Sequence, residues 1–136
     1  MRTTGGSAEL LLDSTILIDL LRGRPAADRV RAARAGGANL CACAINVEEV
    51  VRGLRPGEEQ GADRLFAGLR IVPLREAEGR RAGAWRREFA ARGVTLSQAD
   101  ALIAAAALAA GGRLATGNPR HFPQTELTVE HWPPGA

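Results

Sequence analysis

Short apolar segments that alternate with longer amphipathic segments are the feature that most constrains this chain. Residues 9–13 read ELLLD, and a short apolar run bounded by an acid is typical of a strand buried on both faces. Further strands are predicted at residues 39–44, 70–73, 113–116 and 127–130. Helical patterns fill the intervals, at residues 14–21, 26–34, 46–54, 59–69, 76–92 and 98–110. This alternation predicts an α/β fold around a mostly parallel sheet of four to five strands.

Length and composition fit one globular domain. The chain has 136 residues, of which 46% are hydrophobic, enough to bury a core without disulfides or a structural metal. We expect a single domain over residues 1–136, with loose ends at residues 1–7 and 133–136. The longest apolar stretch, residues 101–110, is too short to span a bilayer, and no hydrophobic leader precedes the first strand. We therefore expect a cytoplasmic protein without a membrane partner.

The charge of the chain is mildly basic and its cations are all arginine. The formal net charge is +3, and all 18 basic residues are Arg. Arginine binds phosphate in bidentate geometry better than lysine does. A GC-rich coding bias explains a chain rich in Arg, Ala and Gly equally well, so composition permits a polyanionic partner without requiring one.

The two cysteines, Cys41 and Cys43, fall on one predicted strand with their side chains on the same face. A disulfide between them would be strained. A zinc site that joins them to His121 and His131 matches no common zinc spacing. The sequence favours two buried thiols.

Polar residues gather where one edge of the sheet should lie. Asp13 closes the first strand, Thr116 closes the fourth, and Asn118 follows it. Glu49 and Asp100 fall on helices that we expect to begin near the same edge. Because ligands of parallel sheets bind at the carboxyl ends of the strands, these five residues are candidates for one site.

Each of these polar residues also has a simpler structural explanation. Asp13 can cap the first helix, and Asp100 can offset a helix dipole. Glu49 can pair with Arg52, and Asn118 can occupy a turn. Taken together, however, three carboxylates ~5 Å apart repel one another by about 3 kcal/mol per pair at an effective dielectric near 20. A cation offsets such repulsion, and a set of oxygen donors suits Mg²⁺ or Mn²⁺.

Four segments follow one another at characteristic separations: residues 11–21 (LLDSTILIDLL), 46–53 (NVEEVVRG), 96–105 (LSQADALIAA) and 114–122 (LATGNPRHF). In this order they resemble the PIN-domain nucleases, and among them the VapC-type toxins of bacterial toxin–antitoxin modules. The resemblance covers residues 10 to about 133. In the second segment, the spacing of four residues between the acid and Gly53 selects Glu49 rather than Glu48.

The resemblance implies a PIN-like three-layer domain with a metal-dependent ribonuclease site. Asp13 and Asp100 would bind Mg²⁺, or Mn²⁺, directly, and Glu49 would bind it directly or through water. Thr116 and Asn118 belong to the fourth segment, where the family often carries an acid. The neutral Asn118 favours one tightly held metal ion over two. Since no His or Lys is adjacent to these acids in the chain, the metal and the carboxylates would have to generate the nucleophile.

The resemblance also implies a substrate and partners. The substrate would be structured RNA, tRNA or rRNA, whose cleavage inhibits translation and arrests growth. The partners would be a cognate VapB-type antitoxin and a second copy of the chain, in a heterotetramer or larger complex. Four arginines expected near the same edge are candidates for contacts with RNA phosphates, or are solvated surface residues: Arg22, Arg24, Arg52 and Arg120.

Other classes of protein fit the sequence less well. A phosphoryl-transfer receiver domain needs a Lys near the end of the chain, and the sequence has none. A phosphatase of the haloacid-dehalogenase type needs Asp where Thr15 stands. A PIN-like domain that binds RNA or protein without significant catalysis stays open, because Asn118 contributes no charge.

Overall fold

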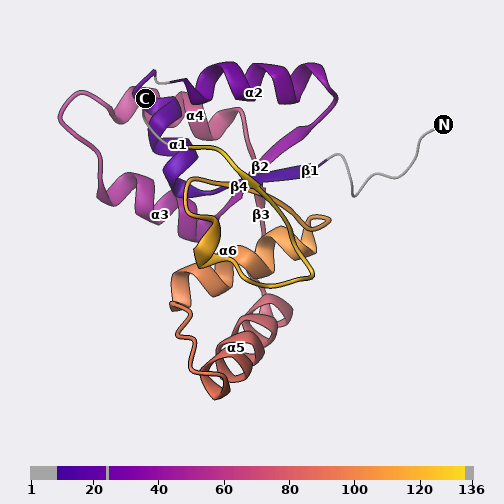
Figure 1. Cartoon of the computed structure of the whole chain (residues 1–136). Coiled ribbons are helices and arrows are strands. Elements are labelled where there is room, and N and C mark those ends of the chain that lie inside the picture. The colour runs from indigo at the N-terminus through magenta and orange to yellow at the C-terminus, as the bar shows by residue number, and fades with distance from the viewer. Residues whose placement is uncertain (1–8, 24, 134–136) are drawn as a thin grey trace.

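The computed structural model describes residues 9–23 and 25–133, and they form a five-stranded sheet in which every neighbouring pair is parallel (Figure 1). The strand order is β3-β2-β1-β4-β5, so the first strand lies at the centre. The strands are β1 (Glu9–Leu12), β2 (Asn39–Cys43), β3 (Arg70–Val72), β4 (Arg113–Thr116) and β5 (Thr128–His131). The predicted α/β fold with a mostly parallel sheet is confirmed.

Helices cover both faces of this sheet. In Figure 1, α1, α2 and α4 lie on one side of the strands, and α5 and α6 lie on the other. The helices are α1 (Ser14–Leu21), α2 (Ala26–Ala35), α3 (Ala44–Arg52), α4 (Glu59–Ala67), α5 (Glu76–Ala91) and α6 (Gln98–Ala109), with a 3₁₀ turn η2 (Pro119–His121). The result is the three-layer arrangement that the resemblance to PIN domains implies.

The central strands are buried on both faces because helices pack on each side. Leu10 and Leu12 pack into an apolar cluster with residues of α1 and α2, and Leu11 packs into a second cluster with α5 and α6. Cys41 and Cys43 both belong to the α5–α6 cluster, which confirms that they share one face of β2. This alternation follows from the twofold side-chain period of a strand.

Helix α3 begins two residues before the predicted start. The sequence pattern predicts a helix over residues 46–54, whereas the helix starts at Ala44 and Cys43 is the residue before it. Asn46 still serves the helix start, since its side-chain oxygen accepts a hydrogen bond from the Cys43 N–H at 2.9 Å. It does so from inside the first turn, in the reciprocal manner of a capping box.

Other boundaries differ from prediction by one or two residues. The last strand is β5 at Thr128–His131 rather than at residues 127–130, because the Leu127 N–H closes a turn onto the carbonyl of Gln124. Helices α3 and α4 end two residues earlier than predicted. Such fraying of helix ends does not move any residue of the predicted site.

The predicted loose ends, at residues 1–7 and 133–136, lie outside the described residues except for Pro133, which is exposed. None of the helices in the described ranges combines the length and the apolar character that crossing a bilayer requires.

Candidate active site

Asp13 lies between the central strand and α1, and both of its carboxylate oxygens accept hydrogen bonds. Oδ1 accepts from the Ser14 N–H at 2.8 Å, which caps α1. Oδ2 accepts from the Thr116 hydroxyl at 2.7 Å. The side chain is buried, with the residue only 6% exposed. Asp13 therefore caps α1, as the sequence allows. The additional hydrogen bond from Thr116, at the end of β4, is not required for capping.

Thr116 connects Asp13 to the loop that follows β4. Its oxygen accepts a hydrogen bond from the Asn118 N–H at 2.9 Å while its proton is donated to Asp13. Asn118 is held through its backbone, and within the described part of the chain its side-chain amide has no hydrogen-bond partner. The backbone of Asn118 thus positions Asp13 through Thr116, and its side chain is exposed.

Glu49 is held against α1 by a chain of hydrogen bonds. Its Oε1 accepts from the Ser14 hydroxyl at 2.5 Å, and the Ser14 oxygen accepts from the Asn46 amide at 3.1 Å. The Asn46 oxygen is already used by the Cys43 N–H, so its NH₂ group must face Ser14. Because Ser14 then has one proton left to donate, Glu49 must act as the acceptor. This chain of hydrogen bonds fixes the orientation of the Glu49 carboxyl group.

The neighbouring acid, Glu48, faces the other way. It is exposed and pairs with Arg52 at 3.0 Å, one turn along the same helix. The ion pair that the sequence suggested for Glu49 therefore belongs to Glu48, and that interpretation of Glu49 is wrong. The side-chain geometry thus selects Glu49 rather than Glu48, as the motif spacing does.

Asp100 is on the first turn of α6, where the Ser97 hydroxyl accepts a hydrogen bond from its N–H at 3.0 Å. Its carboxylate lies 3.2 Å from Nδ1 of His121, which is on the η2 turn. The sequence places no histidine next to the acids in the chain, whereas the fold brings His121 to Asp100.

The three acids interact electrostatically. Burial raises the pKa of Asp13 above its usual value of 3.8. The hydrogen bonds from Thr116 and Ser14 act in the opposite direction, and the negative charges of Asp100 and Glu49 raise the pKa further. A cation beside Asp13 would offset both the burial and the repulsion. Asp100 and Glu49 are thus near enough to act on Asp13 through their charges, and a joint role of the three acids stays a prediction.

The donor set fits a hard divalent cation, since every candidate ligand is a carboxylate oxygen. Across residues 9–23 and 25–133, however, no three His, Cys, Asp or Glu side chains converge closely enough to ligate one ion together. Direct ligation by fewer carboxylates, with water completing the shell, is common for Mg²⁺. The zinc alternative lacks support, because Cys41 and Cys43 are buried free thiols and burial raises the pKa of Cys41 to about 12.

The candidate arginines differ in their surroundings. Arg22 is engaged by Glu58 at 3.1 Å and by the carbonyl of Gly53, so it joins α1 to the segment before α4. Arg52 pairs with Glu48 on the surface of α3. Arg120 is exposed on the η2 turn. Arg24 lies outside the described residues.

Sequence reasoning missed three residues at this site. Ser14 and Asn46 orient Glu49, and His121 adjoins Asp100. Each lay inside one of the four motif segments, and Ser14 directly follows Asp13. Their position in the motifs was the signal, but their contacts depend on the packing of α1 on α3 and of η2 beside α6.

Comparisons with known proteins agree with this geometry. A sequence profile of the PIN domain family matches residues 10–126. Ribonuclease VapC10 of Mycobacterium tuberculosis is 37% identical over 118 residues, which cover 86% of this chain and 88% of that protein. Ribonuclease VapC19 of the same organism is 32% identical over 114 residues, 83% of this chain and 91% of that protein. The fold is similar to VapBC2 from Rickettsia felis bound to a promoter DNA fragment, with a TM-score of 0.79, 21% identity, and 91% and 98% of the two chains covered.

Proposed function

The chain belongs to the PIN-domain family, among the VapC-type ribonucleases, and we propose that it is the toxin of a type II toxin–antitoxin module. We further propose that it cleaves structured RNA, either tRNA or rRNA, and that cleavage requires Mg²⁺ or Mn²⁺. One observation supports this proposal: Asp13 is buried at the carboxyl end of the central strand, held by Thr116 and Ser14, and its pKa is raised first by burial and then by the charges of Asp100 and Glu49. A cluster of this kind without a cation would be electrostatically unfavourable.

Asp13, Glu49 and Asp100 are the residues that would hold the cation. The Thr116 hydroxyl donates to one oxygen of Asp13, and the Ser14 hydroxyl donates to one oxygen of Glu49, so both side chains are oriented before any ligand arrives. When bound, Mg²⁺ or Mn²⁺ supplies Lewis-acid chemistry that acidifies water and stabilises negative charge on the scissile phosphate. The exposed Arg120 is the candidate arginine most available for an RNA phosphate, with Arg22, Arg52 and Arg24 as further candidates.

The proposed partners follow from the relatives. The Rickettsia felis structure is a VapBC complex, and a toxin–antitoxin complex from Klebsiella pneumoniae is 26% identical with a TM-score of 0.70. We propose a VapB-type antitoxin that covers the acidic edge, and a homodimer of this chain within a heterotetramer or larger complex. Inhibition of the active site by a bound antitoxin would explain how a cell can tolerate such an enzyme.

Cleavage by the purified chain tests the proposal. The chain without antitoxin is incubated with tRNA and rRNA in Mg²⁺ or Mn²⁺, and we expect cleavage that EDTA stops. Asp13→Asn and Asp100→Asn should each abolish it, whereas Asp28→Asn, on the exposed surface of α2, should not. Expression of the wild-type chain alone should arrest growth. RNA binding without cleavage would support a PIN-like binding domain instead, and activity that EDTA or Asp13→Asn leaves unchanged would contradict the mechanism.

A further inference from the structure

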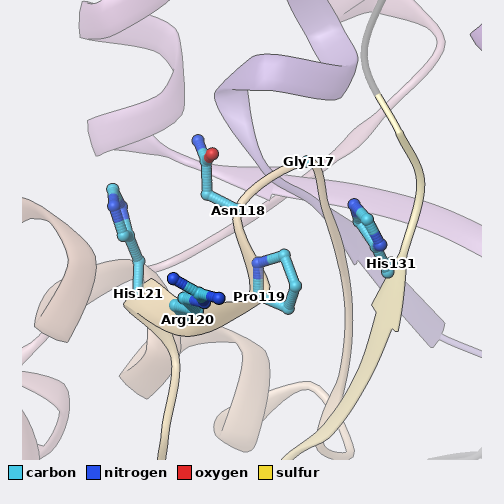
Figure 2. A pocket seen from close by; sticks show the side chains of 6 residues that line it. All are labelled: Gly117, Asn118, Pro119, Arg120, His121 and His131. Carbon is cyan, nitrogen blue, oxygen red and sulfur yellow. The ribbon is translucent and has the colours of Figure 1, made fainter.

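A hollow of about 310 Å³ lies at the edge of the sheet beside the acidic cluster, between the η2 turn and the end of β5. Figure 2 shows its side chains: Arg120 and His121 on the η2 turn, His131 on the opposite wall, and Pro119 between them. Its volume is near the lower end of those of small-molecule pockets, about 300–1,000 Å³. A hollow of this size fits one nucleotide unit better than a longer segment.

The hollow connects directly to the site of the three acids. His131 is the register partner of Thr116 in the β4–β5 pairing, and Thr116 donates to Asp13. Asn118, which lines the hollow, is bonded through its N–H to the same threonine. Two hydrogen bonds therefore separate the wall of the hollow from the buried carboxylate.

A second hollow of about 300 Å³ lies on the other side of the same turn and includes Asp100 in its wall. Arg120 and His121 line both hollows, so they form the ridge that divides them. A strand of nucleic acid that crosses this ridge would place consecutive units in the two hollows. The unit in the first hollow would then lie beside the scissile phosphate rather than at a remote surface.

The chemistry of the first hollow suits a nucleotide. Arg120 is exposed, and the structure gives it no ion pair within residues 9–23 and 25–133, whereas other arginines, such as Arg22, Arg52 and Arg113, pair with glutamates. Its guanidinium is therefore available for a phosphate. The flat imidazole of His131 and the ring of Pro119 offer surfaces on which a base can stack.

We propose that this hollow is a nucleotide subsite that holds the RNA unit on one side of the cleaved phosphodiester, with Arg120 at its phosphate and His131 stacked on its base. The inference rests on the proposed ribonuclease function and adds the residues that hold the nucleotide next to the cleaved bond. Stacking tolerates every base, so we expect His131 to set affinity at this position and to discriminate weakly between bases. An acidic peptide would satisfy Arg120 but would leave the ring surfaces unused.

Binding measured without cleavage tests the subsite. A fluorescein-labelled single-stranded oligoribonucleotide is titrated in EDTA by fluorescence anisotropy, at several salt concentrations, against wild type, Arg120→Gln, His131→Ala and the control Arg87→Gln. Arg87 is exposed on α5, away from the hollow. We expect His131→Ala to weaken binding by about fivefold or more. Arg120→Gln should also reduce the slope of log K against log salt by about 0.7, the value for one phosphate contact with a single strand.

Conservative variants separate contact from structure. Arg120→Lys should restore the salt slope, and His131→Phe should restore affinity, because each keeps the charge or the ring. Arg87→Gln should match wild type. Wild-type affinities in Arg120→Gln and His131→Ala would overturn the subsite, as would equal losses in Arg87→Gln or the absence of any RNA binding by wild type. If these two variants lost affinity for an acidic peptide but bound RNA as wild type does, the hollow would be a site for a protein ligand and the nucleotide subsite would be wrong.

The two proposals fail in different ways. RNA that binds through Arg120 and His131 but is never cut in Mg²⁺ would contradict the ribonuclease function and leave the subsite intact. RNA that is cut with unchanged KM and unchanged cleavage positions in both variants would contradict the subsite and leave the ribonuclease function intact.

Discussion

The two halves of the acidic edge are built differently. In the closed half, Asp13, Glu49 and Thr116 are held by hydrogen bonds from neighbours that are themselves buried, and Thr116 and Asn46 are 0% exposed. In the open half, the carboxylate of Asp100 is 24% exposed and the imidazole of His121 is 56% exposed. The closed half fixes the geometry of two carboxylates in advance, whereas the open half leaves space at which RNA can enter. Among the residues that neighbour the three acids, those of the closed half should therefore have the larger effects when substituted.

The largest difference should separate two adjacent glutamates on α3. Glu49→Gln keeps an oxygen that can accept from the Ser14 hydroxyl but removes the negative charge that would help to hold the cation. We expect kcat to fall about a thousandfold, which corresponds to losing several kcal/mol of transition-state stabilisation. Glu48→Gln breaks an exposed pair with Arg52 on the surface of α3, so cleavage should stay within about twofold of wild type. Parallel RNA cleavage assays give both rates. An equal loss of cleavage rate in the two variants would show that the overall negative charge of α3 matters, and not the carboxylate of Glu49 in particular.

Ser14→Ala tests whether the closed half is oriented by its buried hydrogen bonds. The variant leaves Glu49 without its donor and the Asn46 amide without an acceptor. We expect a loss of about 10- to 100-fold in kcat/KM and in Mn²⁺ affinity, as for other residues that orient metal ligands. The unsatisfied buried amide should also lower the free energy of unfolding by about 1–3 kcal/mol. Ser14→Thr keeps the hydroxyl and should restore Mn²⁺ affinity; if Ser14→Ala binds Mn²⁺ as wild type does, the orienting role is wrong.

The stability of the metal-free protein should depend on pH through Asp13. Its pKa is raised in the folded protein, so the folded state binds the proton more tightly than the unfolded state does. As the pH rises from about 3.8 to the raised pKa of Asp13, the free energy of unfolding of wild type should therefore fall relative to that of Asp13→Asn, by at most about 1.4 kcal/mol per pH unit. Above the raised pKa, the difference between the two proteins should stay constant. Urea unfolding of both proteins across this range measures the difference. A difference that grows in wild type's favour with rising pH would mean that the hydrogen bonds from Thr116 and Ser14 outweigh burial.

The smallest effect should come from His121, the neighbour of Asp100 in the open half. His121 is more than half exposed, and exposed pairs contribute about 0–1 kcal/mol, so His121→Gln should change Mn²⁺ affinity by no more than about fivefold. The same titration that measures Ser14→Ala measures this variant. A loss in His121→Gln as large as that in Ser14→Ala would remove the distinction between the two halves.

The fold was largely readable from the sequence. The five predicted segments became the five strands, and the three inner ones, β2, β1 and β4, are largely buried. Leu10, Leu11 and Leu12 divide between the two apolar clusters as strand periodicity requires. Asp13 and Thr116 come together because both end parallel strands that are neighbours in the sheet. Such placement follows from topology alone.

The contacts that orient the site were not readable. The sequence shows that Ser14 follows Asp13, but its bond to Glu49 depends on how α1 packs against α3. His121 lies 21 positions after Asp100, and only the η2 turn brings it within 3.2 Å of that carboxylate. The helix start at Ala44 differs from the predicted one because Asn46 caps from inside the first turn. Tertiary packing decides each of these features, and local sequence preference does not.

Direct titration with Mn²⁺ tests the central claim that Asp13, Glu49 and Asp100 form one cation site. Calorimetry or paramagnetic resonance on wild type, Asp13→Asn, Glu49→Gln and Asp100→Asn measures affinity and stoichiometry without RNA, and Asp28→Asn on α2 is the control. The account predicts one tightly bound ion per chain in wild type and in Asp28→Asn, and its loss in each of the three site variants. Wild-type affinity in Asp13→Asn, or no binding to the wild-type chain, would contradict it.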